Sequence, residues 1–133
     1  MIATSFWESL VERRNAWDKG KAGWQIKIGS DFRFTAYHFW LFFVMWPLIL
    51  LLPLVVKGWD IKLFGVLVSA YFSGLVIEDF FWYVVNPDVK FKEFFTSFSD
   101  YYFWIKIKGK KIIPVGYALG FIIAAVSWYF LWR

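Results

Sequence analysis

One apolar stretch, residues 62–87, limits what this chain can fold into more than any other. It is long enough to cross a bilayer as a helix, which takes about 20 apolar residues. It ends at Asn86-Pro87, a pair that stops a helix. It also carries two adjacent carboxylates, Glu78 and Asp79. Because an ionisable residue inside a membrane is costly, this pair is a candidate functional site.

The composition agrees with a membrane location. Of 133 residues, 60% are apolar and 26% aromatic, more than a soluble domain of this length can bury. We therefore predict a single membrane domain, residues 1–133, in contact with the lipid bilayer. The net charge of +5 comes from Lys and Arg residues that lie between the apolar blocks, so we expect no nucleic-acid partner. The absence of Cys excludes disulfides and thiolate metal sites.

The hydrophobic pattern predicts an all-α membrane fold. We expect an amphipathic helix over 1–23 in the membrane interface, with Ser5 and Glu8 as a capping box and Glu12 also on the charged face. The alternative is that this helix docks on a soluble partner or on the cytosolic loop. Transmembrane helices are expected over 34–56, 61–85 and 112–132, and a cytoplasmic connection with a short interfacial helix over 86–111.

The distribution of basic residues predicts the topology. Twelve of the 15 Lys and Arg residues lie in the N-terminal region and in the second connection, and three lie on the other side. The positive-inside rule then places the N-terminus in the cytoplasm and the C-terminus outside the cell membrane.

Small residues at four-residue intervals mark a packing face on two of the predicted spans. Such small faces let two helices approach closely in a membrane. We therefore expect the two faces to meet. The residues are Gly65, Ser69 and Ser73 in the second span, and Gly116, Gly120 and Ala124 in the third.

Polar side chains are expected to gather at the cytoplasmic end of the bundle. Glu78 shares a helix face with Gly74 and should point inward, toward a hydrogen-bond donor, whereas Asp79 should meet Lys or Arg at the interface. Replacing Glu78 with Ala is then expected to destabilise the protein more than replacing Asp79. The candidate intramembrane site comprises Arg33, His38, Glu78, Asp79, Asn86 and Tyr117.

This site has two interpretations. In one, Glu78 accepts hydrogen bonds and fixes helix packing; in the other, it serves a metal, a quinone or a proton. We predict no metal ligand set, because one His and a few carboxylates do not readily form a three-ligand transition-metal site. No cofactor is assigned.

Residues 78–87, Glu-Asp-Phe-Phe-Trp-Tyr-Val-Val-Asn-Pro, carry a resemblance to a known group of proteins. The segment resembles the E-D-F-x-W-[FY]-x-x-N-P segment of a family of small, uncharacterised prokaryotic multi-pass membrane proteins. The resemblance extends over about residues 36–117. Pro114 and Tyr117 match the family pattern, but Ile105 follows Trp104 where the family has a His. A metal role implied by the family is weakened at that position.

No catalytic motif supports an enzymatic function. The chain has no Gly-rich phosphate loop, no nucleophile elbow and no paired-His zinc motif. We expect a non-catalytic helical membrane protein, an accessory subunit of a larger membrane complex or a self-associating protein. The alternative is a small-molecule, quinone or cation site formed by His38 and Glu78.

Overall fold

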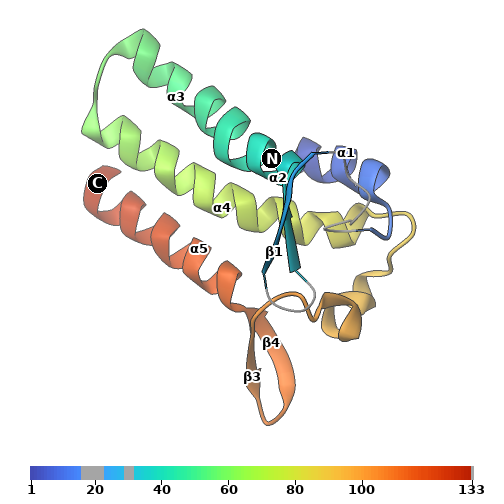
Figure 1. Cartoon of the computed structure of the whole chain (residues 1–133). Coiled ribbons are helices and arrows are strands. Elements are labelled where there is room, and N and C mark those ends of the chain that lie inside the picture. The colour runs from blue at the N-terminus through green and yellow to red at the C-terminus, as the bar shows by residue number, and fades with distance from the viewer. Residues whose placement is uncertain (16–22, 29–31, 133) are drawn as a thin grey trace.

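The fold is built on three long apolar helices. A computed structural model describes residues 1–15, 23–28 and 32–132. Three helical segments within these residues are long and apolar enough to cross a membrane: Ala36–Lys57, Ile61–Val85 and Val115–Trp132. The three long apolar helices predicted from the sequence are therefore confirmed. They run side by side, with the second in the middle (Figure 1).

The first long helix changes its winding before its first proline. It consists of α2 (Ala36–His38), a π-helical segment η1 (Phe39–Met45) and α3 (Trp46–Lys57). Pro47 has no backbone N–H, and its ring would clash with the carbonyl four residues earlier in a regular α-helix. The wider turns of η1 take up that mismatch: the N–H of Trp46 donates to the carbonyl of Leu41, five residues back.

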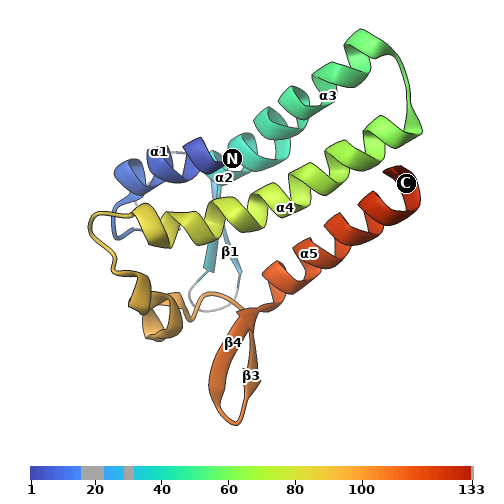
Figure 2. The same cartoon turned by 180° about the vertical axis from the view of Figure 1, so that it is seen from behind.

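The middle helix, α4 (Ile61–Val85), holds the other helices together. Asp60 caps its start by accepting a hydrogen bond from the Leu63 N–H, and it ends at Asn86, before Pro87. It contacts α1 (Ile2–Glu12), α3 and the last helix, α5 (Val115–Ser127) with its π-helical end η4 (Trp128–Trp132). Both views show α1 beside the end of α4 that is far from the α3–α4 turn (Figure 2).

Small residues bring α4 and α5 close together at two of the predicted positions. A Cβ at Gly65 would lie 2.4 Å from the Cβ of Leu131, and a Cβ at Gly120 would lie 2.6 Å from Cγ2 of Val76. Ala124 is buried, whereas Ser73 Oγ donates to the Ser69 carbonyl within its own helix. Gly116 does not pack: no described atom lies within 4 Å of a Cβ built there.

Two antiparallel hairpins correct the all-α prediction. Strands β1 (Gln25–Ile28) and β2 (Phe32–Thr35) form one, and β3 (Trp104–Ile107) and β4 (Lys110–Pro114) form the other. The second hairpin turns at Lys108-Gly109, both with positive φ, as a two-residue turn between twisted strands requires. The alternation of Ile and Lys over 105–108 is a strand pattern. As a result α5 begins at Val115, not at residue 112.

The connection after α4 contains less helix than predicted. It contains two 3₁₀ turns, η2 (Phe91–Phe95) and η3 (Ser97–Ser99). Their aromatic side chains form a core with the end of α4 and the start of α5. This core is made of Val76, Trp82, Tyr83, Val89, Phe94 and Tyr117.

The N-terminal helix has its polar face inward. Phe6 and Leu10 are more than half exposed, whereas Ser5, Glu8 and Glu12 are buried. The predicted capping box is not formed, because the helix begins at Ile2 with Met1 as its N-cap. The helix ends at Glu12, and residues 16–22 of the predicted 1–23 helix lie outside the described residues.

Candidate functional site

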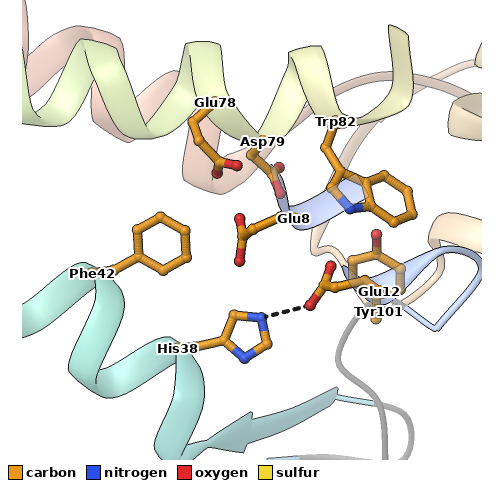
Figure 3. A pocket seen from close by; sticks show the side chains of 8 residues that line it. All are labelled: Glu8, Glu12, His38, Phe42, Glu78, Asp79, Trp82 and Tyr101. Carbon is orange, nitrogen blue, oxygen red and sulfur yellow. Dashed lines mark ion pairs between the residues drawn. The ribbon is translucent and has the colours of Figure 1, made fainter. Parts of the chain in front are cut away.

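Two carboxylate side chains and one imidazole side chain, from two helices, meet in a small cavity. Glu8 and Glu12 come from α1 and His38 comes from α2 (Figure 3). One ligand-capable atom from each lies within 4.8 Å of the other two. Oε1 of Glu12 is 3.2 Å from Nε2 of His38. All three residues are buried.

The spacing along α1 explains why both of its glutamates reach the cavity. Residues four apart lie on one face of an α-helix, so Glu8 and Glu12 point the same way. Ser5 and Ser9 belong to the same face and are also buried. Ser5 Oγ donates to the backbone carbonyl of Glu78 at 2.8 Å, which fixes α1 against α4. The whole polar face of α1 is therefore turned toward α4.

A contact at the second ring nitrogen, Nδ1, holds the ring of His38 in place. Nδ1 lies 2.7 Å from the hydroxyl of Thr35, the N-cap residue of α2. Phe42, one turn further on, stacks beside the ring with a centroid distance of 6.2 Å. These contacts leave Nε2 directed at Glu12, so the nitrogen that faces the cavity can bind a proton or a cation.

Glu78 enters the same cavity from α4. It is only 3% exposed, and Figure 3 shows its carboxyl group pointing toward Glu8. The two carboxyl groups lie within hydrogen-bonding reach of each other. Oε1 of Glu78 receives no hydrogen bond from any described residue. The inward direction expected for Glu78 is observed, but its nearest polar neighbour is another carboxyl group and not the expected donor.

Asp79 has different partners from those expected. Its Oδ2 accepts hydrogen bonds from the hydroxyl groups of Tyr102, at 2.5 Å, and Tyr117, at 2.6 Å. Burial and the neighbouring Asp79 carboxylate raise the pKa of Tyr102 well above its ordinary value, which keeps this hydroxyl a donor. Two neutral donors thus replace the Lys or Arg that the sequence led us to expect.

The cavity is small and lined by acids. Its volume is about 20 Å³, which is enough for one water molecule or one ion. No Lys or Arg is among the described residues that line it. Four of the eight carry a carboxyl group: the lining consists of Glu8, Glu12, His38, Phe42, Glu78, Asp79, Trp82 and Tyr101.

Three of the six predicted site residues do not line this cavity: Tyr117, which donates to Asp79, and Arg33 and Asn86. Arg33 is on β2, opposite Lys27 of β1. Asn86 is buried and acts as a connector: its Nδ2 donates to the Arg13 carbonyl at 2.6 Å, and its Oδ1 accepts from the Asp88 and Val89 N–H groups. Its contacts fasten the end of α1 to the end of α4.

Sequence reasoning missed Glu8 and Glu12 as site residues. A signal was present, because two glutamates four residues apart share a face with two serines, a face that can pack against polar groups of another helix. The amphipathic pattern shows that α1 has two faces, but it does not show which face meets the bundle.

The chain was also compared with known proteins. It matches no family model, no curated protein and no solved structure.

Proposed function

We propose that this protein binds a divalent cation between its N-terminal helix and its membrane-spanning helices. The ligands are Glu8, Glu12 and His38, with Glu78 beside them. The observation that supports this most strongly is the charge of the cavity: four carboxyl groups line it, and no Lys or Arg does so among the described residues. Buried carboxylates that face one another repel strongly unless protons or a cation lie between them.

The side chains suit a borderline divalent ion. Carboxylates bind Mn²⁺ well, and imidazole adds affinity for Fe²⁺ and Zn²⁺. The ligands of a tetrahedral Zn²⁺ lie about 3.4 Å apart, so the three atoms, now within 4.8 Å, need only a small inward movement. Thr35 supports the assignment, because a His ligand usually donates its second N–H to a neighbouring oxygen.

The cation joins parts of the chain that are far apart in sequence. It would hold α1 to α2, beside Glu78 of α4, at one end of the bundle. The accessory-subunit hypothesis loses one of its supports, because Gly120 is already used against Val76 within this chain. We therefore carry forward a cation site, which the sequence suggested as an alternative at His38 and Glu78. The ligand set proposed here differs: it keeps His38 and adds Glu8 and Glu12, which were not assigned from the sequence.

Metal binding by the purified full-length chain tests the proposal. After chelation, titration with MnCl₂ and with ZnCl₂ followed by calorimetry should show one ion per chain. Glu12→Gln should weaken binding about ten-fold or more. Asp100→Asn, a change of the same kind at an exposed ion pair with Lys111, should leave it unchanged. Equal binding by wild type and Glu12→Gln, or no binding by wild type, would refute the site.

We further propose that the cation end of the bundle faces the cytoplasm. The support is the positive-inside rule applied to the sequence, in which the N-terminal region and the second connection hold 12 of the 15 Lys and Arg residues. In this orientation α1 lies in the interface with its apolar side toward lipid.

Because the chain contains no Cys, single-Cys variants report on orientation cleanly. A membrane-impermeant maleimide added to intact cells should label Trp59→Cys, in the α3–α4 turn, and not Lys106→Cys, in β3. Both should react after lysis. The opposite pattern would invert the orientation without affecting the cation site.

A further inference from the structure

A second, larger chamber lies beside the acidic cavity and shares part of its lining. Its volume is about 240 Å³, and most of its surface is apolar. Side chains from η1, α4 and the start of α5 line it, among them Phe43, Leu75 and Val76. All three belong to membrane-spanning segments, so the chamber is at a depth where lipid-soluble molecules are present.

The two spaces share a wall of polar groups. His38, Phe42, Glu78 and Asp79 line both of them. The chamber is therefore an apolar space with a polar end, and such a shape suits a ligand with an apolar body and one polar group.

One acceptor at the polar end has no hydrogen-bond donor among the described residues. Oε1 of Glu78 is buried and receives no hydrogen bond from the described part of the chain. Asp79, in contrast, already accepts from Tyr102 and Tyr117. A buried acceptor without a donor is unfavourable, so the ligand that fits here brings its own O–H group.

The chamber has a side on which a ligand can enter. Gly116 of α5 lines it and is exposed, and no described atom lies within 4 Å of a Cβ built at this position. Phe43 is also more than half exposed. Access from the bilayer therefore runs past Gly116, and a larger side chain at that residue would fill the space without colliding with the backbone.

From this geometry we propose that the chamber binds a membrane-dissolved molecule with a hydroxyl head group, whose O–H donates to Oε1 of Glu78 while its hydrocarbon body lies between η1, α4 and α5. Long-chain alcohols, isoprenoid alcohols and quinols share this chemistry. The inference goes beyond the cation site and does not require it, because it stands on Glu78 and on the chamber.

Photo-crosslinking of the full-length protein in lipid nanodiscs tests the proposal. The probe is a hexadecanol that carries a diazirine near its hydroxyl end, and its methyl ether is the matched probe without a donor. The alcohol should label residues of η1 and α4 that line the chamber, as mapped by mass spectrometry, and the ether should give only background labelling. Equal labelling by the two probes would refute the role of the hydroxyl donor.

One variant closes the chamber and another serves as its control. Gly116→Leu should reduce labelling to background, whereas Leu119→Phe, at a half-exposed residue of the same helix outside the chamber lining, should not. A thermal melting temperature equal to that of wild type shows that Gly116→Leu is folded. Unchanged labelling in that variant would refute the chamber as the binding site.

Competition identifies the source of the hydroxyl group. Farnesol should displace the probe if the natural ligand is an isoprenoid alcohol, and decylubiquinol should do so if it is a quinol; displacement by neither would refute both classes. Running each experiment with EDTA and with Mn²⁺ separates the two sites. If labelling persists in Glu12→Gln while Mn²⁺ binding is lost, the chamber binds its ligand without the cation.

Discussion

The two halves of α4 are held to their neighbours by different means. In the first half, Gly65 lets the backbone of α4 approach Leu131, and the Tyr71 hydroxyl donates a hydrogen bond to the Phe42 carbonyl of η1 at 2.6 Å. In the second half, Val76 packs closely against Gly120, and α4 also meets Ser5, Tyr102 and Tyr117 through hydrogen bonds to the Glu78 backbone and the Asp79 side chain.

The two kinds of contact differ in the substitutions that they can tolerate. Lipid tails are as apolar as Leu, so helices associate in a membrane through close packing and hydrogen bonds and not through removal of water. The close packing at Gly65 therefore depends on a residue without a side chain, and the contacts at Glu78 and Asp79 depend on specific hydrogen-bond partners. Substitutions at the two ends should separate these two kinds of dependence.

The largest effect is expected where space is tightest. Gly65→Ala places a Cβ 2.4 Å from Cβ of Leu131 and 3.2 Å from the Ser127 carbonyl oxygen, so the helices must move apart. We expect the free energy of unfolding to fall by about 3 kcal/mol, measured by SDS titration in mixed micelles. Gly116→Ala is the control and should be neutral or stabilising, because nothing described crowds that position. Equal losses at the two glycines would contradict close packing as the cause.

The next largest effect is expected at Asp79. Asp79→Ala removes the acceptor of two Tyr hydroxyl groups and should cost about 2 kcal/mol of unfolding free energy. Asp79→Asn keeps one acceptor oxygen and should cost less. In metal-free protein, Glu78→Ala should cost less than Asp79→Ala, because it removes one of several crowded carboxyl groups. This order reverses the sequence-based prediction, and the opposite order would restore it.

A smaller effect is expected at the contact between α1 and α4. Ser5→Ala removes the hydrogen bond to the Glu78 carbonyl and should cost about 1 kcal/mol. Ser9→Ala is the matched control, since Ser9 is equally buried but donates only to Phe6 of its own helix. Hydrogen exchange of the α1 amides should rise in the first variant and not in the second. If the two behave alike, the serine does not fix the helix.

The smallest effect is expected on the outer surface of the same end. Arg14 donates to Glu93 at 2.8 Å, and this contact lowers the pKa of the Glu93 carboxyl. A carboxyl group with a lowered pKa in the folded state contributes stability at neutral pH, and the contribution is lost as the pH falls through that pKa. Because the pair is exposed, Arg14→Ala should lower the free energy of unfolding only slightly, and by less than Ser5→Ala does. Thermal melts at neutral and acidic pH should differ less in the variant than in wild type, and an equal difference would contradict the contact.

How far the sequence could predict this fold depends on the kind of signal at each residue. The long helices follow from the length of the apolar blocks, which sets a physical minimum for crossing a membrane. The close approach at Gly65 follows from side-chain size. The hairpin 104–114 was missed because a strand of four residues gives too few alternations to stand out against the aromatic residues around it.

The candidate site was harder to predict than the fold. Its partners are far apart in sequence: Tyr117 is 38 residues from Asp79, and Ser5 is 73 residues from Glu78. Periodicity places residues around one helix but does not say which helix they will meet. Glu78 and His38 were identified because polar residues inside apolar blocks are conspicuous. Glu8 and Glu12 were not, because charged residues on an amphipathic helix are ordinary.

The outward apolar face of α1 has a consequence for biosynthesis. The chain is made from its N-terminus, so α1 leaves the ribosome long before the residues of α4 to which its polar face binds, with Glu78 lying 73 residues after Ser5. During that interval Phe6 and Leu10 can rest on the bilayer surface, while Glu8 and Glu12 remain in water. Docking then requires that the end of α4 that carries Glu78 come to lie against the polar face of α1.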